Sequence, residues 1–370
     1  MEATNLQKAK QYEKINLVLS IFSTILSIVI LILFVTLGYS AQLRDVISEW
    51  FENSYLQLLV FLFSIGLGYS VISFPLSFFG DFWLEHYFDL SNQTFFAWMW
   101  EKIKGFLVGL VLGVPLILAF YFFLLNYPAT WWFWTATILF FFSIIIGKIA
   151  PQVIFPLFYK FEKLNDESLL TRMKSLAEKG KFSLEGVYRF DMSKSTKKAN
   201  AAFTGMGKTK RIILGDTLIE KFNEDEIEGV FAHEVGHYVH KHIIQGVVVG
   251  TISSYLSLYI AHLVFSEIIV KYNFSSVADL AALPILSLII TVISLISSPL
   301  SNMLSRHNER QADTYALQNS TNPAAFIEAL QKLAESNLSD PEPHPLIEFL
   351  FHSHPSVANR VKFAEGVLNQ

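Results

Sequence analysis

The sequence predicts a mainly α-helical protein that crosses a membrane six times and carries a smaller part of helices and short strands outside the bilayer. Composition is the first observation: 52% of the 370 residues are hydrophobic, only 16% are charged, and the chain holds 34 Phe and 7 Trp. A series of long apolar stretches is the second, and the gathering of the polar residues into two segments is the third. Together they are typical of a polytopic membrane protein.

Six apolar stretches approach or reach the length of a membrane span. A helix needs about 20 apolar residues to cross the hydrocarbon core of a bilayer. The stretches run approximately over residues 17–37, 56–79, 105–125, 131–146, 243–265 and 280–304, and none contains Lys, Arg, Asp or Glu. The first is interpreted as a retained helix, because its apolar core is too long for a signal peptide and no small-residue cleavage site accompanies it.

The basic residues predict how these spans are oriented. Lys and Arg near the ends of spans are retained on the cytoplasmic side. With six spans, the loops of one side contain only Arg44 and Lys271, whereas both termini and the other basic loops share the opposite side. We therefore expect both termini in the cytoplasm, in either a bacterial plasma membrane or the endoplasmic reticulum.

The spans divide the chain into four parts. Residues 1–150 hold four spans, 151–241 form a polar segment, 242–304 form a transmembrane hairpin and 305–370 form a polar tail. In the polar segment, a helix is expected after Asn165, and short strands are expected at 187–191, 199–204 and 211–214, with a turn at 205–207.

A further helix in the polar segment carries a metal-binding pattern. Asn223 is a suitable N-cap with Glu226 three residues later, so a helix begins there and continues into HEVGH at 233–237. Residues four apart lie about 40° apart around a helix, so both imidazoles can reach one ion. Glu234 is expected to take a proton from water, whose pKa a zinc ion can lower to roughly 7. A solvated helix face is the alternative interpretation of this short pattern.

A catalytic zinc site usually has three protein ligands. His233 and His237 would supply two, and the third is sought just after the sixth span, where Glu309 and Asp313 stand four residues apart. These two share a helix face, so one can bind the metal while the other steadies a ligating histidine. Because a two-helix hairpin returns the chain to the same side of the membrane, the two halves can meet. We expect one zinc ion per chain, although by itself the second segment also fits an ordinary charged helix.

Other chemistries are less compatible with the composition. The chain has no cysteine, which excludes disulfides, thiolate ligands and a cysteine nucleophile. Its formal net charge is only −4, so nothing indicates nucleic acid as a partner. The partners expected are a peptide or protein substrate and the lipid bilayer. The oligomeric state stays open.

The motifs together resemble the type I CAAX prenyl endopeptidases, integral-membrane zinc proteases that process the yeast a-factor and prelamin A. The resemblance rests on HEVGH at 233–237, ERQAD at 309–313, and the tail His354-Pro355-Ser356 with Arg360. Residues 80–94, 151–160 and 198–203 are also similar to the family, so the likeness covers most of the chain from about residue 60. It implies six to seven membrane helices around a chamber, the HEVGH helix being the seventh, and a small α+β zincin-like catalytic portion.

The resemblance also implies residue roles. Glu309 would be the third ligand, with Asp313 and Arg360 supporting the site. His354 would stabilise the oxyanion of the tetrahedral intermediate. Asn200 and Ala201 would line an edge strand to which an extended peptide pairs. Phe203 stands where the family commonly has Tyr, and a prenylated substrate is implied as well.

Two rival interpretations remain at this level. An HtpX-like membrane quality-control metalloprotease would share the zinc motifs, although it resembles a shorter chain with fewer spans. A non-enzymatic membrane transporter or lipid-binding protein would use the histidines only as structural residues. His240 and His242, which follow the motif, are interpreted as solvated polar positions without a role.

Overall fold

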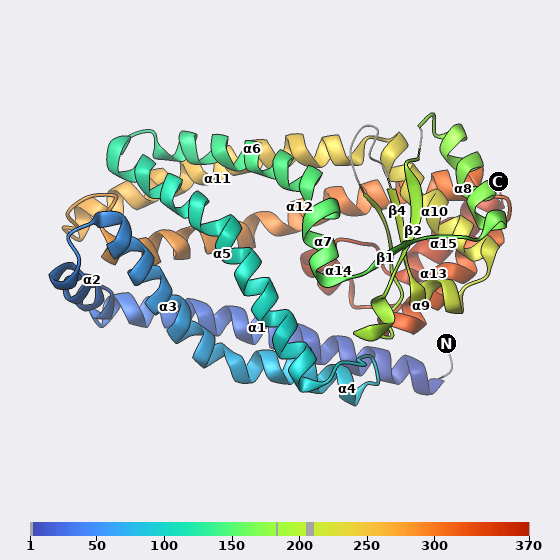
Figure 1. Ribbon diagram of the computed structural model, residues 1–370, viewed down its shortest axis with the longest axis horizontal. Helices are drawn as coiled ribbons and strands as arrows, with labels where there is room; N and C mark the ends of the chain where they lie inside the picture. Colours follow the sequence, from blue (N-terminus) through green and yellow to red (C-terminus); the bar gives the residue numbers. More distant parts are fainter. Residues whose placement is uncertain (1–2, 183, 205–210, 370) are drawn as a thin grey trace.

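The computed structural model describes residues 3–182, 184–204 and 211–369. Long helices form one end of the molecule, and a small sheet with shorter helices forms the other end (Figure 1). Both ends of the chain lie beside the part that carries the sheet. The expected mainly α-helical fold with a small α+β portion is therefore confirmed.

Six helices in the described part of the chain are long and apolar enough to cross a membrane. They are α1 (Ala3–Thr36), α3 (Ser54–Ser77), α5 (Phe95–Asn126), α6 (Trp131–Ile149), α11 (His242–Lys271) and α12 (Leu283–Asn319). Each contains one of the stretches predicted from the sequence, apart from one to three residues at some ends, and several continue well beyond it. The chain is an integral membrane protein, and α12 continues from its apolar stretch into the part that carries the sheet (Figure 1).

Short helices connect the spans. α2 (Tyr39–Trp50) lies at the end of the molecule away from the sheet, where the Ser40 hydroxyl donates to the Ala281 carbonyl at 2.7 Å and Arg44 pairs with Asp279 at 2.9 Å. These contacts hold the α1–α3 connection against the α11–α12 connection. A π-helical segment (Phe78–Leu84) runs into α4 (Glu85–Tyr87), and a second one (Ala150–Ile154) runs into α7 (Phe155–Phe158).

The sheet has four strands in the order β1-β2-β4-β3. They are β1 (Phe161–Lys163), β2 (Gly186–Phe190), β3 (Ala201–Thr204) and β4 (Arg211–Gly215). β2 and β4 are parallel, and the other two pairs are antiparallel. The three strands expected from the sequence are present within two residues of their predicted starts, whereas the short β1 was not predicted. The turn expected at 205–207 lies outside the described residues. β3 is an edge strand.

One helix, α10 (Glu224–Val239), forms the centre of the part that carries the sheet. Phe231, Ala232 and Val235 are almost completely buried in its core. The surrounding helices are α8 (Glu167–Lys179), α9 (Asp216–Lys221), α13 (Pro323–Asn337), α14 (Pro345–Phe351) and α15 (Val357–Leu368). Burial on several sides fixes the position of α10 relative to α12 and the sheet.

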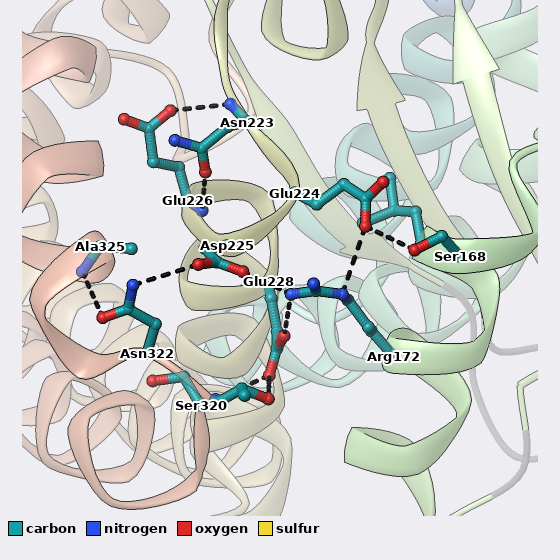
Figure 2. Close-up of polar contacts among 12 residues, drawn as sticks. Ser168, Arg172, Asn223, Glu224, Asp225, Glu226, Glu228, Ser320, Asn322 and Ala325 are labelled. Atoms are coloured by element: carbon teal, nitrogen blue, oxygen red, sulfur yellow. Dashed lines mark hydrogen bonds and ion pairs between the residues drawn. The ribbon is translucent and has the colours of Figure 1, made fainter.

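The start of α10 is fixed by polar contacts (Figure 2). Asn223 and Glu226 form the predicted capping box: the Glu226 amide donates to Asn223 Oδ1 at 2.9 Å, and the Asn223 amide donates to Glu226 Oε2 at 2.8 Å. One turn later, Glu228 accepts from Arg172 of α8 at 3.0 Å and from the Thr321 amide and hydroxyl at 2.8 and 2.7 Å. The network ties α10 to its neighbours on both sides.

Removal of the buried Glu228 carboxylate should loosen this end of α10. Glu228→Ala leaves Thr321 and Arg172 without their shared acceptor, and we expect a loss of about 2 kcal/mol, since Arg172 keeps Asp225. The apparent melting temperature of the purified protein in detergent should fall by about 2–4 °C. Glu178→Ala, at an exposed position of α8, is the matched control and should change it little. An equal effect of both variants would contradict the role of this network.

Candidate metal centre and active site

Three side chains from two helices converge on one point. His233 Nε2 and His237 Nε2, both on α10, are 3.1 Å apart. Glu309 of α12 places Oε1 3.2 Å from His237 Nε2 and Oε2 3.5 Å from His233 Nε2. Ligand atoms placed tetrahedrally about 2.1 Å from a zinc ion lie about 3.4 Å from each other. The separations and the two-nitrogen, one-oxygen donor set therefore fit a zinc ion.

The convergence depends on the close approach of α10 and α12. A Cβ atom on Gly236 would lie 2.8 Å from the Ala312 Cα, so only glycine allows this crossing. α12 is one continuous helix from Leu283 to Asn319, which means that Glu309 is carried on an extension of a membrane span. The two ends of the 242–304 hairpin thus meet at the site, as the number of crossings predicted.

His233 is supported on its other ring nitrogen. Nδ1 lies 2.8 Å from Asp313 Oδ1, and Asp313 is itself held by the largely buried Arg360 guanidinium at 2.6 and 2.9 Å. Burial lowers the pKa of His233, but the hydrogen bonds with Asp313 and Glu309 outweigh burial and raise the pKa to about 9. A metal ion that binds His233 at neutral pH therefore displaces a proton.

A cavity of about 490 Å³ opens beside the three converging side chains. Its lining includes Asn200, Ala201, Glu234, Asn337, His354 and Arg360. His354, exposed over 63% of its side chain, places Nδ1 2.9 Å from Glu309 Oε2. The loop before it is held by Arg306 of α12, whose Nη1 donates to the carbonyls of Glu348 and His352. Every site residue expected from the sequence therefore contacts the candidate metal centre or lines its cavity.

The edge strand presents backbone groups to this cavity. The Asn200 carbonyl accepts from Gly215 of β4 at 2.9 Å. Since N–H and C=O groups alternate in direction along a strand, those of Ala199 and Ala201 point away from β4. Asn337 occupies both groups of Ala199, accepting from its amide at 2.9 Å and donating to its carbonyl at 3.2 Å. Ala201 is thus the first position at which an added strand can pair. The side chain of Phe203 lies outside the described part.

Two residues near the site were missed by the sequence analysis. Asn337 had no recognisable motif, because its contact with Ala199 joins segments 138 residues apart. His242, interpreted as solvated, is instead buried and lies 3.0 Å from His237. The i+5 spacing from His237 would have suggested contact only if a helix break between the two residues had been recognised.

Comparisons with known proteins agree with this geometry. Residues 163–368 match the model of peptidase family M48, and residues 1–160 match the model described as CAAX prenyl protease N-terminal, five membrane helices. An uncharacterized metalloprotease of Bacillus subtilis, YhfN, is 28% identical over 99% of this chain and 86% of its own length. The CAAX prenyl protease 1 homolog of Arabidopsis thaliana is 31% identical over 85% of this chain and 75% of its own.

A solved structure supports the same conclusion for the whole fold. The crystal structure of S. mikatae Ste24p superposes with a TM-score of 0.89 at 25% identity, covering 99% of this chain and 90% of that one. A non-enzymatic transporter or lipid-binding protein is therefore excluded. The chain belongs to peptidase family M48, in its CAAX prenyl protease group, and is an integral-membrane metalloprotease.

Proposed function

We propose that this chain is a zinc endopeptidase that cleaves prenylated proteins near their carboxyl termini on the cytoplasmic side of its membrane. The observation that carries the proposal is the meeting of His233, His237 and Glu309 beside a cavity that also holds Glu234 and an open strand edge. One zinc ion per chain is the metal that this donor set suits best.

The side chains fit a hydrolytic mechanism. A zinc ion, when bound, supplies Lewis-acid activation of water and of the substrate carbonyl. Glu234, next to His233 on α10 and facing the cavity, accepts the proton of the attacking water and delivers it to the leaving amine. His354 donates to the carbonyl oxygen as negative charge develops on it. Ala201, with its outward backbone groups, holds the peptide as an additional strand next to Asn200.

A cavity in the membrane part supports the proposal that the substrate carries a lipid. An apolar cavity of about 680 Å³ lies among the spanning helices α1, α3, α5 and α12, with Leu58, Leu62 and Leu286 in its lining. An isoprenoid chain is an apolar ligand of the kind that such a space accommodates. The similarity to CAAX prenyl proteases points to the same substrate class.

The orientation follows from the position of the site. α2, which contains Arg44, and the end of α11, which is Lys271, lie away from the sheet (Figure 1), whereas the basic residues of 151–241 belong to the sheet-bearing part with the site. By the charge rule, the sheet-bearing part faces the cytoplasm. The host membrane is a bacterial plasma membrane or the endoplasmic reticulum.

A pair of peptides tests the substrate class. Purified protein with zinc should cleave a farnesylated CAAX peptide with a kcat/KM at least about tenfold above that of the same peptide without the lipid, because burial of the chain adds binding energy. Removal of zinc by a chelator should abolish cleavage of both peptides. Equal cleavage of the two peptides would instead favour an HtpX-like quality-control protease and would contradict the prenyl assignment.

A further inference from the structure

A helix break beside the candidate metal centre places a further histidine, His242, against one of the candidate ligands. α10 ends at Val239, Lys241 adopts a left-handed conformation with φ of 59°, and α11 begins at His242. The side chain of His242 is turned back and buried, with Nδ1 3.0 Å from His237 Nδ1. His237 uses its other ring nitrogen, Nε2, toward Glu309. His242 therefore contacts the ligand on the side away from the metal position.

A glutamine from α12 completes the contact. Gln311 Oε1 lies 2.8 Å from His242 Nε2, and Gln311 Nε2 lies 3.3 Å from His307 Nε2. The amide nitrogen can only donate, so it donates to His307 while the amide oxygen accepts from His242. His242 then carries its proton on Nε2, and its Nδ1 has a free lone pair. That lone pair can only accept a hydrogen bond, so His237 Nδ1–H is the donor.

The direction of these hydrogen bonds decides whether His237 can bind a metal. With the proton on Nδ1, Nε2 of His237 has a lone pair directed at the centre. If the Gln311 amide were reversed, each donor would become an acceptor, and Nε2 of His237 would carry the proton. A protonated Nε2 cannot be a ligand.

We propose that His242 and Gln311 are positioning residues that hold His237 in the tautomer and orientation that bind the metal. The inference rests on the proposed metal site but not on the proposed substrate. His237 thereby gains what His233 has from Asp313, a fixed partner on Nδ1. The partner here is a neutral imidazole–amide pair, contributed by the first residue of α11 and by α12. Support of this kind typically changes metal affinity by 10–100-fold.

The zinc affinity of the purified full-length protein in detergent tests the proposal. The dissociation constant is measured with zinc alone, in competition with a chromophoric chelator, so no peptide substrate is involved. We expect His242→Phe and Gln311→Met to weaken zinc binding by about 10–100-fold. Gln311→Glu keeps an oxygen acceptor for His242 and should stay within about threefold of the native protein. His240→Phe is the control, because His240 is exposed and a phenyl ring can keep the contacts that its imidazole makes with the rings of His242 and Tyr315.

Circular dichroism and melting temperature establish that each variant is folded. Native-like zinc affinity in folded His242→Phe and Gln311→Met proteins would overturn the proposal. It would also be overturned if Gln311→Glu weakened binding as much as Gln311→Met, since Gln311 would then act by packing and not as an acceptor. A native protein that binds zinc tightly but fails to cleave the farnesylated peptide would refute the proposed substrate while leaving this inference intact.

Discussion

Glu234→Gln should reduce peptide cleavage by about 10²–10⁴-fold while zinc stays bound. The amide has nearly the shape of the carboxylate, but it cannot accept a proton from the attacking water, and general-base catalysis typically contributes 10²–10⁴-fold. Glu234 lines the cavity beside the converging side chains and is not one of the three that meet. The measurements are kcat/KM on the farnesylated peptide and the zinc content of the purified variant.

Glu220→Gln serves as the control for this variant, because Glu220 is an exposed carboxylate on α9. Its kcat/KM should match that of the native protein. If Glu234→Gln kept more than a tenth of the native turnover, Glu234 could not be the proton acceptor. If it lost zinc together with activity, the carboxylate would have to be assigned to metal binding.

Glu309→Gln should weaken zinc binding by more than about 100-fold, beyond the range observed when only a supporting partner of a ligand is lost. The substitution removes the single anionic ligand from a buried site in which the other two ligands are neutral when metal is bound. The Gln side chain keeps the volume of Glu, so the crossing of α10 and α12 should persist. Zinc affinity and melting temperature are measured together.

The neighbouring Arg310→Ala provides the comparison for Glu309→Gln. Arg310 is exposed on α12 and precedes the buried Ala312 that contacts α10. Its replacement should leave zinc affinity within about threefold of the native value. Tight zinc binding by a folded Glu309→Gln protein would remove Glu309 from the ligand set.

The sequence predicted those features that depend on residues close together in the chain. Apolar length alone located the six spans, and the capping box at Asn223 located the start of α10. The meeting of His233 with Glu309 needed one further step, the even number of crossings between them. That argument succeeds because each span crosses the bilayer once, so a hairpin of two spans brings the chain back to the side from which it started.

Features that depend on distant segments or subtle backbone changes could not be predicted. The three residues of β1 are too few to show an alternating pattern. Asn337 contacts Ala199 only because α13 packs next to the edge strand. His242 was misinterpreted because one left-handed residue, Lys241, reverses the direction in which the following side chain points. Local composition contains no signal for any of these contacts.

The route of α12 has an evolutionary consequence. α12 runs without a break from Leu283 to Asn319, so the same helix spans the membrane and carries a candidate metal ligand, Glu309. No truncation can yield a water-soluble protease from this chain, because any continuous piece that contains both His233 and Glu309 also contains the apolar helix α11 and the apolar part of α12. A soluble descendant would have to replace α11 and half of α12 with a new connection of the same reach. The membrane hairpin and the protease site must therefore be inherited together.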